Sequence, residues 1–172
     1  MIAVNTKLTG TIPPQLGTLS SLQQLWLYTN SLSGTLPSQL GQLSSLQYLR
    51  MDSNQLTGSI PTQLSQLNEL KAVVLFENSL SGSIPSELGL QEQLEILILS
   101  VNQFTGTVPS QLAALADTLD VLHLISNQLS GTIPNSLCGV GYNHTDCLFS
   151  SCGIFIECSH LLCGCDCPCQ DS

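Results

Sequence analysis

Residues 22–45 read LQQLWLYTNSLSGTLPSQLGQLSS. Near the start of this segment, Leu25 and Leu27 alternate with Trp26 and Tyr28, which is the period of a strand with two different faces. If the leucines point into a core, the two large aromatic side chains lie on the face that should meet water. The rest of the chain must explain that face, because the segment is one copy of a pattern that recurs.

The recurring unit is 24 residues long. Its copies begin at Leu22, Leu46, Leu70, Leu94 and Leu119, 24 residues apart three times and then 25. Each reads L-x-x-L-x-L-x-x-N-x-L-x-G-x-I-P-x-x-L-x-x-L-x-x with small changes. An asparagine recurs at 5, 30, 54, 78, 102 and 127, a glycine at 10, 34, 58, 82, 106 and 131, and a proline at 13, 37, 61, 85, 109 and 134. This register predicts a stack of similar coils.

Each recurring column has a physical role. The strand leucines, such as Leu25 and Leu27, are expected to pack against neighbouring coils, because one coil cannot cover its own apolar side. The asparagine ends the strand, and its amide can bond backbone groups at the turn and the next asparagine. The glycine permits a positive φ or a close backbone approach, and the proline keeps the following helical turn from extending backwards.

The pattern resembles the leucine-rich-repeat family, in particular its plant-type subclass with LxGxIPxxLxxLxxL. The resemblance covers roughly residues 2–137 and implies an α/β fold, a right-handed horseshoe-shaped solenoid with a parallel sheet on its concave side. We expect residues 1–137 to form about six coils and residues 138–172 to form a disulfide-rich C-terminal cap. Ile2 is assigned to the position of Leu27, which predicts that the first coil is truncated.

Two copies depart from the pattern. In LGLQEQ, Leu90 comes one place early and Gln91 stands where a buried leucine is expected. In LAALADT, the unit at 94–118 carries one extra residue. Both changes are expected to distort the outer wall locally and to leave the strands in register.

In such a solenoid, the strand residues between the leucines project from the concave sheet in three columns. The first column is Gln24, Tyr48, Ala72, Ile96 and Val121; the second is Trp26, Arg50, Val74, Ile98 and His123; the third is Tyr28, Asp52, Phe76, Ser100 and Ile125. Because parallel strands stack about 4.8 Å apart, these side chains should form one continuous surface.

That surface is apolar at ten of its fifteen positions, and a contiguous exposed apolar patch marks a contact site. Trp, Tyr and Arg are also the residue types enriched at binding hot spots. We predict that a protein or peptide binds there, through Trp26, Tyr28, Tyr48, Arg50, Asp52, Val74, Phe76, Ile98 and His123. Two alternatives stay open: self-association through the same face, and a sheet composition that merely suits strands. Arg50 and Asp52 are either a polar registration point or an ordinary solvated pair.

A second surface carries hydroxyl groups on both sides of the recurring glycine. One row is Thr9, Ser33, Thr57, Ser81, Thr105 and Ser130, and the other is Thr11, Thr35, Ser59, Ser83, Thr107 and Thr132. Regular rows of threonine and serine can order water, and some plant leucine-rich-repeat proteins bind ice. Ice binding is therefore a further alternative, against the simpler interpretation that small polar residues suit this position of the subclass.

All eight cysteines follow the repeats: Cys138, Cys147, Cys152, Cys158, Cys163, Cys165, Cys167 and Cys169. An economical hypothesis pairs the four early with the four late ones, because neighbours in C-x-C cannot bridge comfortably. SLCG at 136–139 is similar to the cap of plant receptor-like and polygalacturonase-inhibitor-type proteins, and the dense C-x-C ending resembles algal leucine-rich-repeat proteins. Thiolate metal binding is the alternative, although no paired C-x-x-C zinc spacing is present and no metal site is predicted. The sequon at Asn143 predicts glycosylation.

Composition narrows the remaining classes of function. A net charge of −9 with three basic residues argues against nucleic-acid binding, and no apolar run approaches the ~20 residues that span a bilayer. No signal peptide precedes the repeats, but the cysteines and the sequon predict an extracellular or cell-surface protein. His123 has no acid within reach on its face and no cofactor fingerprint is present, so we predict no enzyme activity and no cofactor.

Overall fold

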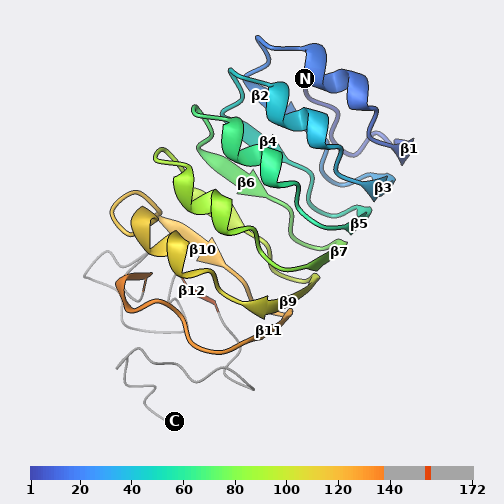
Figure 1. Ribbon diagram of the computed structural model, residues 1–172. Coiled ribbons are helices and arrows are strands. Elements are labelled where there is room, and N and C mark those ends of the chain that lie inside the picture. The colour runs from blue at the N-terminus through green and yellow to red at the C-terminus, as the bar shows by residue number, and fades with distance from the viewer. Residues whose placement is uncertain (138–153, 156–172) are drawn as a thin grey trace, which may run out of the picture.

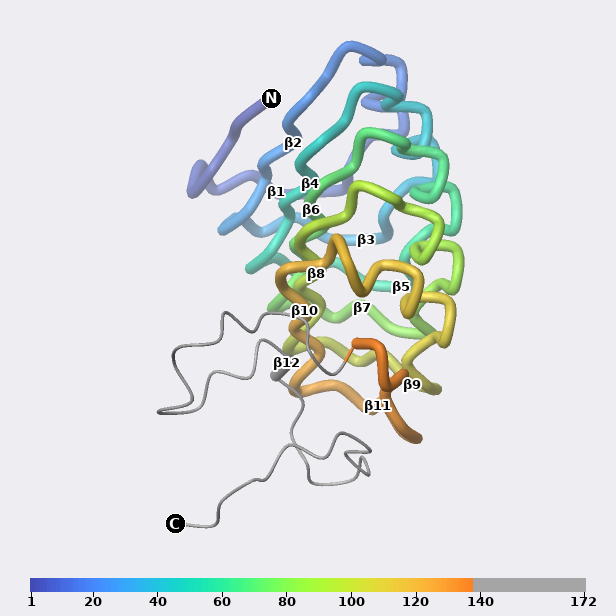
Figure 2. The backbone as a smooth tube through the Cα atoms, turned by 90° about the vertical axis from the view of Figure 1, so that its left-hand side faces the viewer, coloured from blue at the N-terminus to red at the C-terminus, as the bar shows by residue number. Residues whose placement is uncertain are grey.

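The computed structural model describes residues 1–137 and the two-residue strand 154–155. In this part, successive coils lie one on the next, and each full coil contributes a strand to each of two parallel six-stranded sheets and one short 3-10 helix. Figure 1 shows the two rows of strands and the row of helical turns, and Figure 2 shows the coils following one another from the N-terminus. The predicted solenoid is confirmed.

The sheet in the place expected for the concave side is called the concave sheet here. It consists of β2 (Gln24–Trp26), β4 (Tyr48–Arg50), β6 (Ala72–Val74), β8 (Ile96–Ile98), β10 (Val121–His123) and β12 (Ile154–Phe155). The second sheet consists of β1 (Thr9–Thr11), β3 (Ser31–Thr35), β5 (Gln55–Gly58), β7 (Ser79–Gly82), β9 (Gln103–Thr107) and β11 (Gln128–Ser130). The 3-10 helices are η1 (Pro14–Thr18), η2 (Ser38–Gln42), η3 (Thr62–Gln66), η4 (Ser86–Leu90), η5 (Ser110–Leu115) and η6 (Asn135–Leu137).

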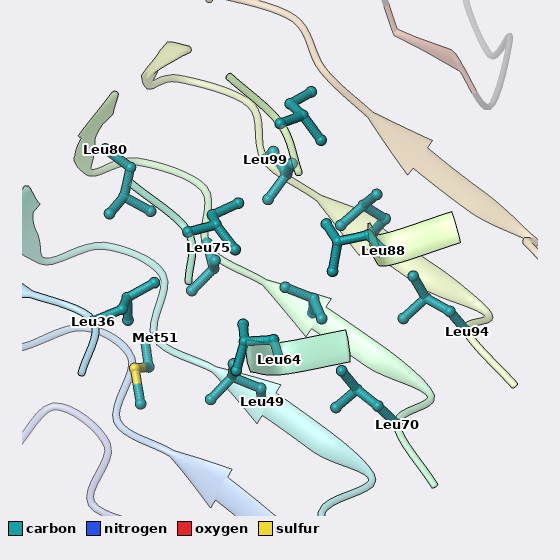
Figure 3. Packing of buried hydrophobic residues seen from close by; sticks show 14 of the residues in the cluster. Leu36, Leu49, Met51, Leu64, Leu70, Leu75, Leu80, Leu88, Leu94 and Leu99 are labelled. Carbon is teal, nitrogen blue, oxygen red and sulfur yellow. The ribbon is translucent and has the colours of Figure 1, made fainter. Parts of the chain in front are cut away.

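The core is one continuous cluster between the two sheets and the helices. Leucines from the concave strands, from the second sheet and from the helices meet in it, and most are fully buried. Figure 3 shows Leu49 and Leu64 of the copy that begins at Leu46 with Leu70, Leu75 and Leu88 of the next copy. Because each coil packs its apolar side chains against those of its neighbours, the stack and not the single coil is stable.

The recurring proline immediately precedes each helix rather than lying within it. Pro37 and its equivalents have an extended conformation, and their carbonyl oxygens accept the first helical hydrogen bond, as from the Leu40 N–H at 3.0 Å. A proline at this position loses no helical bond, because its missing N–H would have had no partner there.

The recurring glycine meets two demands at once. Gly34 and Gly58 have φ of +74° and +75°, where side chains are strained. A Cβ on Gly34 would also lie 2.9 Å from the Thr11 Cγ2 of the preceding coil, and Gly58 meets Thr35 in the same way. The threonine methyl group therefore packs on the bare glycine of the next coil.

The recurring asparagine joins neighbouring coils. Asn54 Nδ2 donates to the carbonyl oxygens of Leu27 at 3.0 Å and Met51 at 3.1 Å, and its Oδ1 accepts the Leu32 N–H at 3.0 Å. The predicted bonds from these amides to backbone groups are confirmed, whereas in the part of the chain that the structure describes the recurring asparagines bond to backbone groups, and Asn30 also to the Thr6 hydroxyl, but not to one another.

Two predicted assignments in the first coil were wrong. Thr6, not Asn5, lies at the asparagine position, because the Leu8 N–H donates to Asn30 Oδ1 as the Leu32 N–H does to Asn54 Oδ1, and the Asn5 N–H donates to the Tyr28 carbonyl as the Thr29 N–H does to that of Asp52. Ile2 pairs with Trp26 instead of matching Leu27, and Ala3 takes the inward position. The cause is a single residue: Asn5 precedes its glycine by five positions, whereas Asn30 precedes Gly34 by four.

The two irregular copies behave as expected. Gln91 is 2% exposed at the leucine position, and Leu90 is 69% exposed. The extra residue of the next copy lengthens η5 to six residues, while β8 and β10 keep their pairing of Val121 with Ile96. The strands remain in register.

Little of the cysteine-rich tail is described. Its strand β12 pairs in parallel with β10, Ile154 opposite Leu122 and Phe155 opposite His123, and thus lies against the last repeat's edge of the concave sheet. All eight cysteines and Asn143 lie outside the described residues, so the disulfide, metal and glycosylation hypotheses stay predictions. Within the described ranges, no helix is long and apolar enough to cross a bilayer.

Candidate functional site

The strand register brings the predicted columns together. Trp26 pairs with Arg50, Arg50 with Val74, Val74 with Ile98, and Ile98 with His123. The first column follows the same register from Gln24 to Val121. The third column lies just beyond the strand ends, where backbone bonds continue the ladder: the Thr29 N–H donates to the Asp52 carbonyl, and the equivalent bond recurs in each following coil to Ile125.

The candidate residues differ in how far they reach the surface. Trp26, Tyr28, Tyr48, Phe76 and Ile98 are half-buried, so part of each ring or chain stays accessible, as it does for His123. Val74 is 8% exposed and Asp52 is 2% exposed. These two form the floor of the face, and a partner would contact the residues around them.

Arg50 is held in place from two sides. Its Nε donates to Asp52 Oδ1 at 2.8 Å and its Nη2 to Asp52 Oδ2 at 3.4 Å, while its Cζ lies 4.0 Å from the centroid of the Tyr28 ring. The Asp52 hydrogen bond raises the pKa of Arg50 above its ordinary value. Because Asp52 is buried, the pair is not a solvated surface pair, and the guanidinium is a fixed cation within an apolar face.

Two further candidates have features that the sequence did not indicate. The Trp26 Nε1 atom is buried and has no hydrogen-bond partner, so the indole is positioned by packing alone. Burial lowers the pKa of His123 below its ordinary value, which favours the neutral imidazole on this face.

Two apolar residues that the predicted columns did not include also belong to this surface. Ile2, which is 60% exposed, extends the column of Trp26 by one strand position. Val101 follows Ser100 at the strand end and is 47% exposed. The sequence does single out Val101, because the equivalent residues of the neighbouring coils, Glu77 and Ser126, are polar.

The hydroxyl rows lie on the second sheet and are mostly exposed. The register is staggered: Thr11 pairs with Ser33 and Thr35 with Thr57, so residues of different rows become lateral neighbours. The Ser33 hydroxyl donates to the Gly10 carbonyl at 3.4 Å, and that of Ser130 to the Gly106 carbonyl. Some serine hydroxyls thus bond within the fold, and serine and threonine alternate irregularly along the rows.

Sequence comparison identifies the repeat. The family described as Leucine Rich Repeat matches four segments, residues 21–43, 45–67, 93–115 and 118–140. The coil between the second and third segments, which contains Leu90 and Gln91, is not matched although its strands continue both sheets. No curated protein matches the chain.

Solved structures show the same architecture at substantial identity. The ectodomain of the membrane receptor kinase GASSHO1/SCHENGEN3 from Arabidopsis thaliana, in complex with CASPARIAN STRIP INTEGRITY FACTOR 2, is 40% identical with a TM-score of 0.75, over 78% of this chain and 16% of that one. The plant peptide hormone receptor RGFR1 in complex with RGF2 is 39% identical with a TM-score of 0.74, over 78% and 21%. A plant ice-binding protein is 36% identical with a TM-score of 0.63, over 81% and 52%. The chain therefore spans less than a quarter of either receptor chain.

Proposed function

Because the chain belongs to the leucine-rich repeat family, we propose that it is a non-enzymatic recognition module that binds a protein or peptide through its concave sheet. One observation carries this proposal: Trp26, Arg50, Val74 and Ile98 are consecutive lateral neighbours on a face that is largely apolar. Val74 forms the buried floor of this face, and the partly accessible side chains around it, such as Trp26 and Ile98, lose unfavourable contact with water when a partner covers them.

The fixed guanidinium of Arg50 would orient a partner on this surface, in addition to the apolar contact that the surface offers. Asp52 and the Tyr28 ring restrict its rotamers before any partner arrives, so binding costs little side-chain entropy. The part of the guanidinium that is not bonded to Asp52 offers donors to a carbonyl or carboxylate oxygen of the partner. A peptide with apolar side chains over Trp26 and Tyr48 and a hydrogen-bond acceptor over Arg50 would match the chemistry of this surface.

The solved neighbours support a peptide as the ligand and an extracellular location. RGFR1, a plant peptide hormone receptor, is in complex with RGF2, and the GASSHO1/SCHENGEN3 ectodomain is in complex with CASPARIAN STRIP INTEGRITY FACTOR 2. We accordingly place this module outside the cell or at its surface, where the cysteine-rich tail would form the predicted disulfides.

The test uses peptides selected from a random 12-residue display library on the full 172-residue chain. Substituting Trp26→Ala or Tyr48→Ala is expected to raise the dissociation constant of the selected peptides by about tenfold or more. The control is Leu90→Ala, which removes an exposed apolar side chain on the helical side of the stack. Unchanged affinity in both concave variants, with the fold retained by circular dichroism, would reject the proposal.

Self-association through the same face is the structural alternative. It predicts a concentration-dependent dimer in sedimentation velocity, which the Trp26→Ala variant abolishes. A monomer at all concentrations, with peptide binding intact, leaves recognition of another molecule as the function.

Ice binding is a second candidate, which the similarity to a plant ice-binding protein and the exposed threonines of the second sheet favour. Within a strand, the two hydroxyl positions beside the glycine are about 6.6 Å apart, and neighbouring strands are about 4.8 Å apart. This candidate predicts thermal hysteresis that Thr35→Lys or Thr107→Lys removes. A solution without hysteresis eliminates it, and the concave variants serve as the matched controls.

A further inference from the structure

We infer that residues 154–161 are a degenerate seventh copy of the repeat, which docks on the open side of the last regular coil and covers its core. The inference is independent of the proposed function. Three observations carry it: the register of β12, the spacing of the residues that follow β12 in the sequence, and the difference between the two ends of the described stack.

The pairing of β12 sets the register. Ile154 lies opposite Leu122 and Phe155 opposite His123, in the same parallel arrangement that joins β10 to β8 (Figures 1 and 2). Ile154 therefore takes the strand position that Leu122 holds in the preceding coil. Because each other strand of this sheet belongs to one copy of the repeat, the residues after β12 can be compared with a copy by counting from Ile154.

The residues after β12 keep the spacing of the repeat. In the last regular copy, the inward strand positions, the asparagine and the next apolar position are Leu122, Leu124, Asn127 and Leu129. At the same spacing from Ile154 stand Ile156, Ser159 and Leu161. The apolar columns are kept, and the asparagine is replaced by serine. The positions after Phe155 are assigned by sequence spacing, since they lie outside the described residues, and the match ends at Leu161, because Cys163 stands where the glycine is expected.

The two ends of the described stack differ in exposure. In the first coil, Leu8 is 37% exposed and Leu16 is half-buried. Their equivalents in the last regular coil, Leu129 and Leu137, are 7% and 0% exposed, although only the two residues of β12 follow that coil among the described residues. An end coil is open on one side unless another segment packs on it, so a later part of this chain is the natural cover.

The last regular coil also presents the backbone groups that an asparagine of a following coil would bond. Asn127 Nδ2 donates to the Leu99 carbonyl at 3.1 Å, and its Oδ1 accepts the Phe104 N–H at 3.0 Å, which joins its coil to the preceding one. The equivalent groups of the last regular coil are the Leu124 carbonyl and the Leu129 N–H. A residue of the seventh copy at the asparagine position would therefore lie next to these two groups.

Serine at this position fits a copy that ends the stack. Its hydroxyl is a single oxygen on a shorter side chain, so it does not span both backbone groups as an amide does. Without the asparagine and the glycine, the seventh copy can pack on the coil before it but offers little to a coil after it. It thereby removes β10 as a free sheet edge to which another chain could add.

The first test restores the amide in the full chain. Ser159→Asn is expected to raise the melting temperature by about 2–4 °C, because the new side chain can bond the Leu124 carbonyl and the Leu129 N–H. Hydrogen exchange at the Leu129 amide should slow in the same variant. His160→Asn is the matched control, since it places the same side chain one position out of register, and it should produce neither effect.

The second test makes one substitution at two adjacent positions. Ile156→Asn places a polar group at an inward position and is expected to lower the melting temperature by about 4 °C or more. Glu157→Asn, at the outward position equivalent to Ile125, should change it by less than about 1 °C. Both variants keep all eight cysteines, so the tail can form the same bridges in each. Thermal unfolding followed by circular dichroism compares them.

Either test can overturn the inference. Equal melting temperatures for Ser159→Asn and His160→Asn, with equal exchange at the Leu129 amide, would mean that Ser159 does not hold the asparagine position. Equal effects of Ile156→Asn and Glu157→Asn would mean that the residues after β12 do not alternate as a repeat strand does. If Ile156→Asn fails to fold, the comparison of Ser159→Asn with His160→Asn decides.

Discussion

At the level of single residues, Gln91 is a polar side chain in a position that is apolar in the neighbouring coils. It occupies the position of Leu67 and Leu115 in the neighbouring coils and is almost fully buried. Its Nε2 donates to the Leu64 carbonyl at 3.3 Å, but its Oε1 has no partner. A buried oxygen that has left water without finding a donor lowers the free energy of unfolding.

Gln91→Leu is therefore expected to stabilise the protein by about 1–3 kcal/mol. The Leu64 carbonyl keeps a partner in the variant, because it also accepts the Leu67 N–H. Denaturant unfolding followed by circular dichroism measures the change. Leu90→Gln, at the exposed neighbouring position, is the control and should stay within about 0.5 kcal/mol; a loss of stability in Gln91→Leu contradicts the assignment.

His123 gives the stability a dependence on pH. Burial lowers its pKa below 6.5 in the folded state, so the unfolded chain binds more protons as the pH falls through this range. The contribution of His123 is thus fully present above pH 6.5 and is lost as the pH decreases toward its folded pKa. The melting temperature of the unchanged chain should fall more between about pH 7.5 and about pH 5.5 than that of His123→Gln. Equal decreases in both proteins would show that His123 does not contribute.

At the level of elements, the separation between successive helices depends on a glycine. A Cβ on Gly41 in η2 would lie 2.3 Å from the Gln63 carbonyl oxygen at the start of η3. Gly17 and Gly89 stand in the same relation to the following helices. In η3 the equivalent residue is Ser65, which already carries a Cβ.

Gly41→Ala is expected to destabilise the stack by about 1–3 kcal/mol, because two backbones must move apart. Ser65→Ala is the matched control at the same helical position, and it should be nearly neutral. Unfolding in urea compares the two variants. Equal stability of Gly41→Ala and the unchanged chain would mean that the helices are less closely packed than the structure shows.

The elements were largely predictable from the sequence because each recurring residue acts locally. Leu25 fixes the inward face of its strand, Gly34 the left-handed turn, and Pro37 the start of its helix. The assignment of the first coil was wrong because Asn5 lies close to the asparagine column, and the one-residue offset is visible only in the bonds of Leu8 and Asn5, which match those of Leu32 and Thr29.

The lateral order of the candidate site residues was predictable from the sequence, but the extent to which each is buried was not. The lateral order of Trp26, Arg50 and Val74 follows from the repeat length alone. The burial of Asp52 and its bond to Arg50, whose guanidinium lies on the Tyr28 ring of the preceding coil, could not be read from the sequence pattern. The left-handed conformation of Val101 likewise arises from the turn geometry and not from valine itself.

For the whole molecule, the two proposed binding functions fall on different sheets. The concave sheet carries the aromatic and aliphatic columns with Arg50 among them, and the second sheet carries the hydroxyl rows, which are mostly exposed. Figure 1 shows the two rows of strands. Each face repeats laterally at the spacing of the coils, so a ligand of either face would contact residues that are about 24 positions apart in the sequence.

The cysteine-rich tail is expected to be oxidised. Intact mass spectrometry before and after reduction of the full chain should show a gain of about eight hydrogens, two for each of four bridges. The unreduced chain should resist alkylation by iodoacetamide. Free alkylation of all eight thiols, or release of a metal ion on acidification, would instead support thiolate metal binding.

The most direct test of the concave docking surface is a titration of the isotope-labelled full chain with a library-selected peptide, followed by amide chemical shifts. We predict changes that recur along the sequence in β2, β4, β6 and β8, near Trp26, Arg50, Val74 and Ile98, while β3, β5 and β7 stay unchanged. Changes confined to the second sheet, or to one continuous segment of the chain, would contradict a binding site assembled from stacked coils.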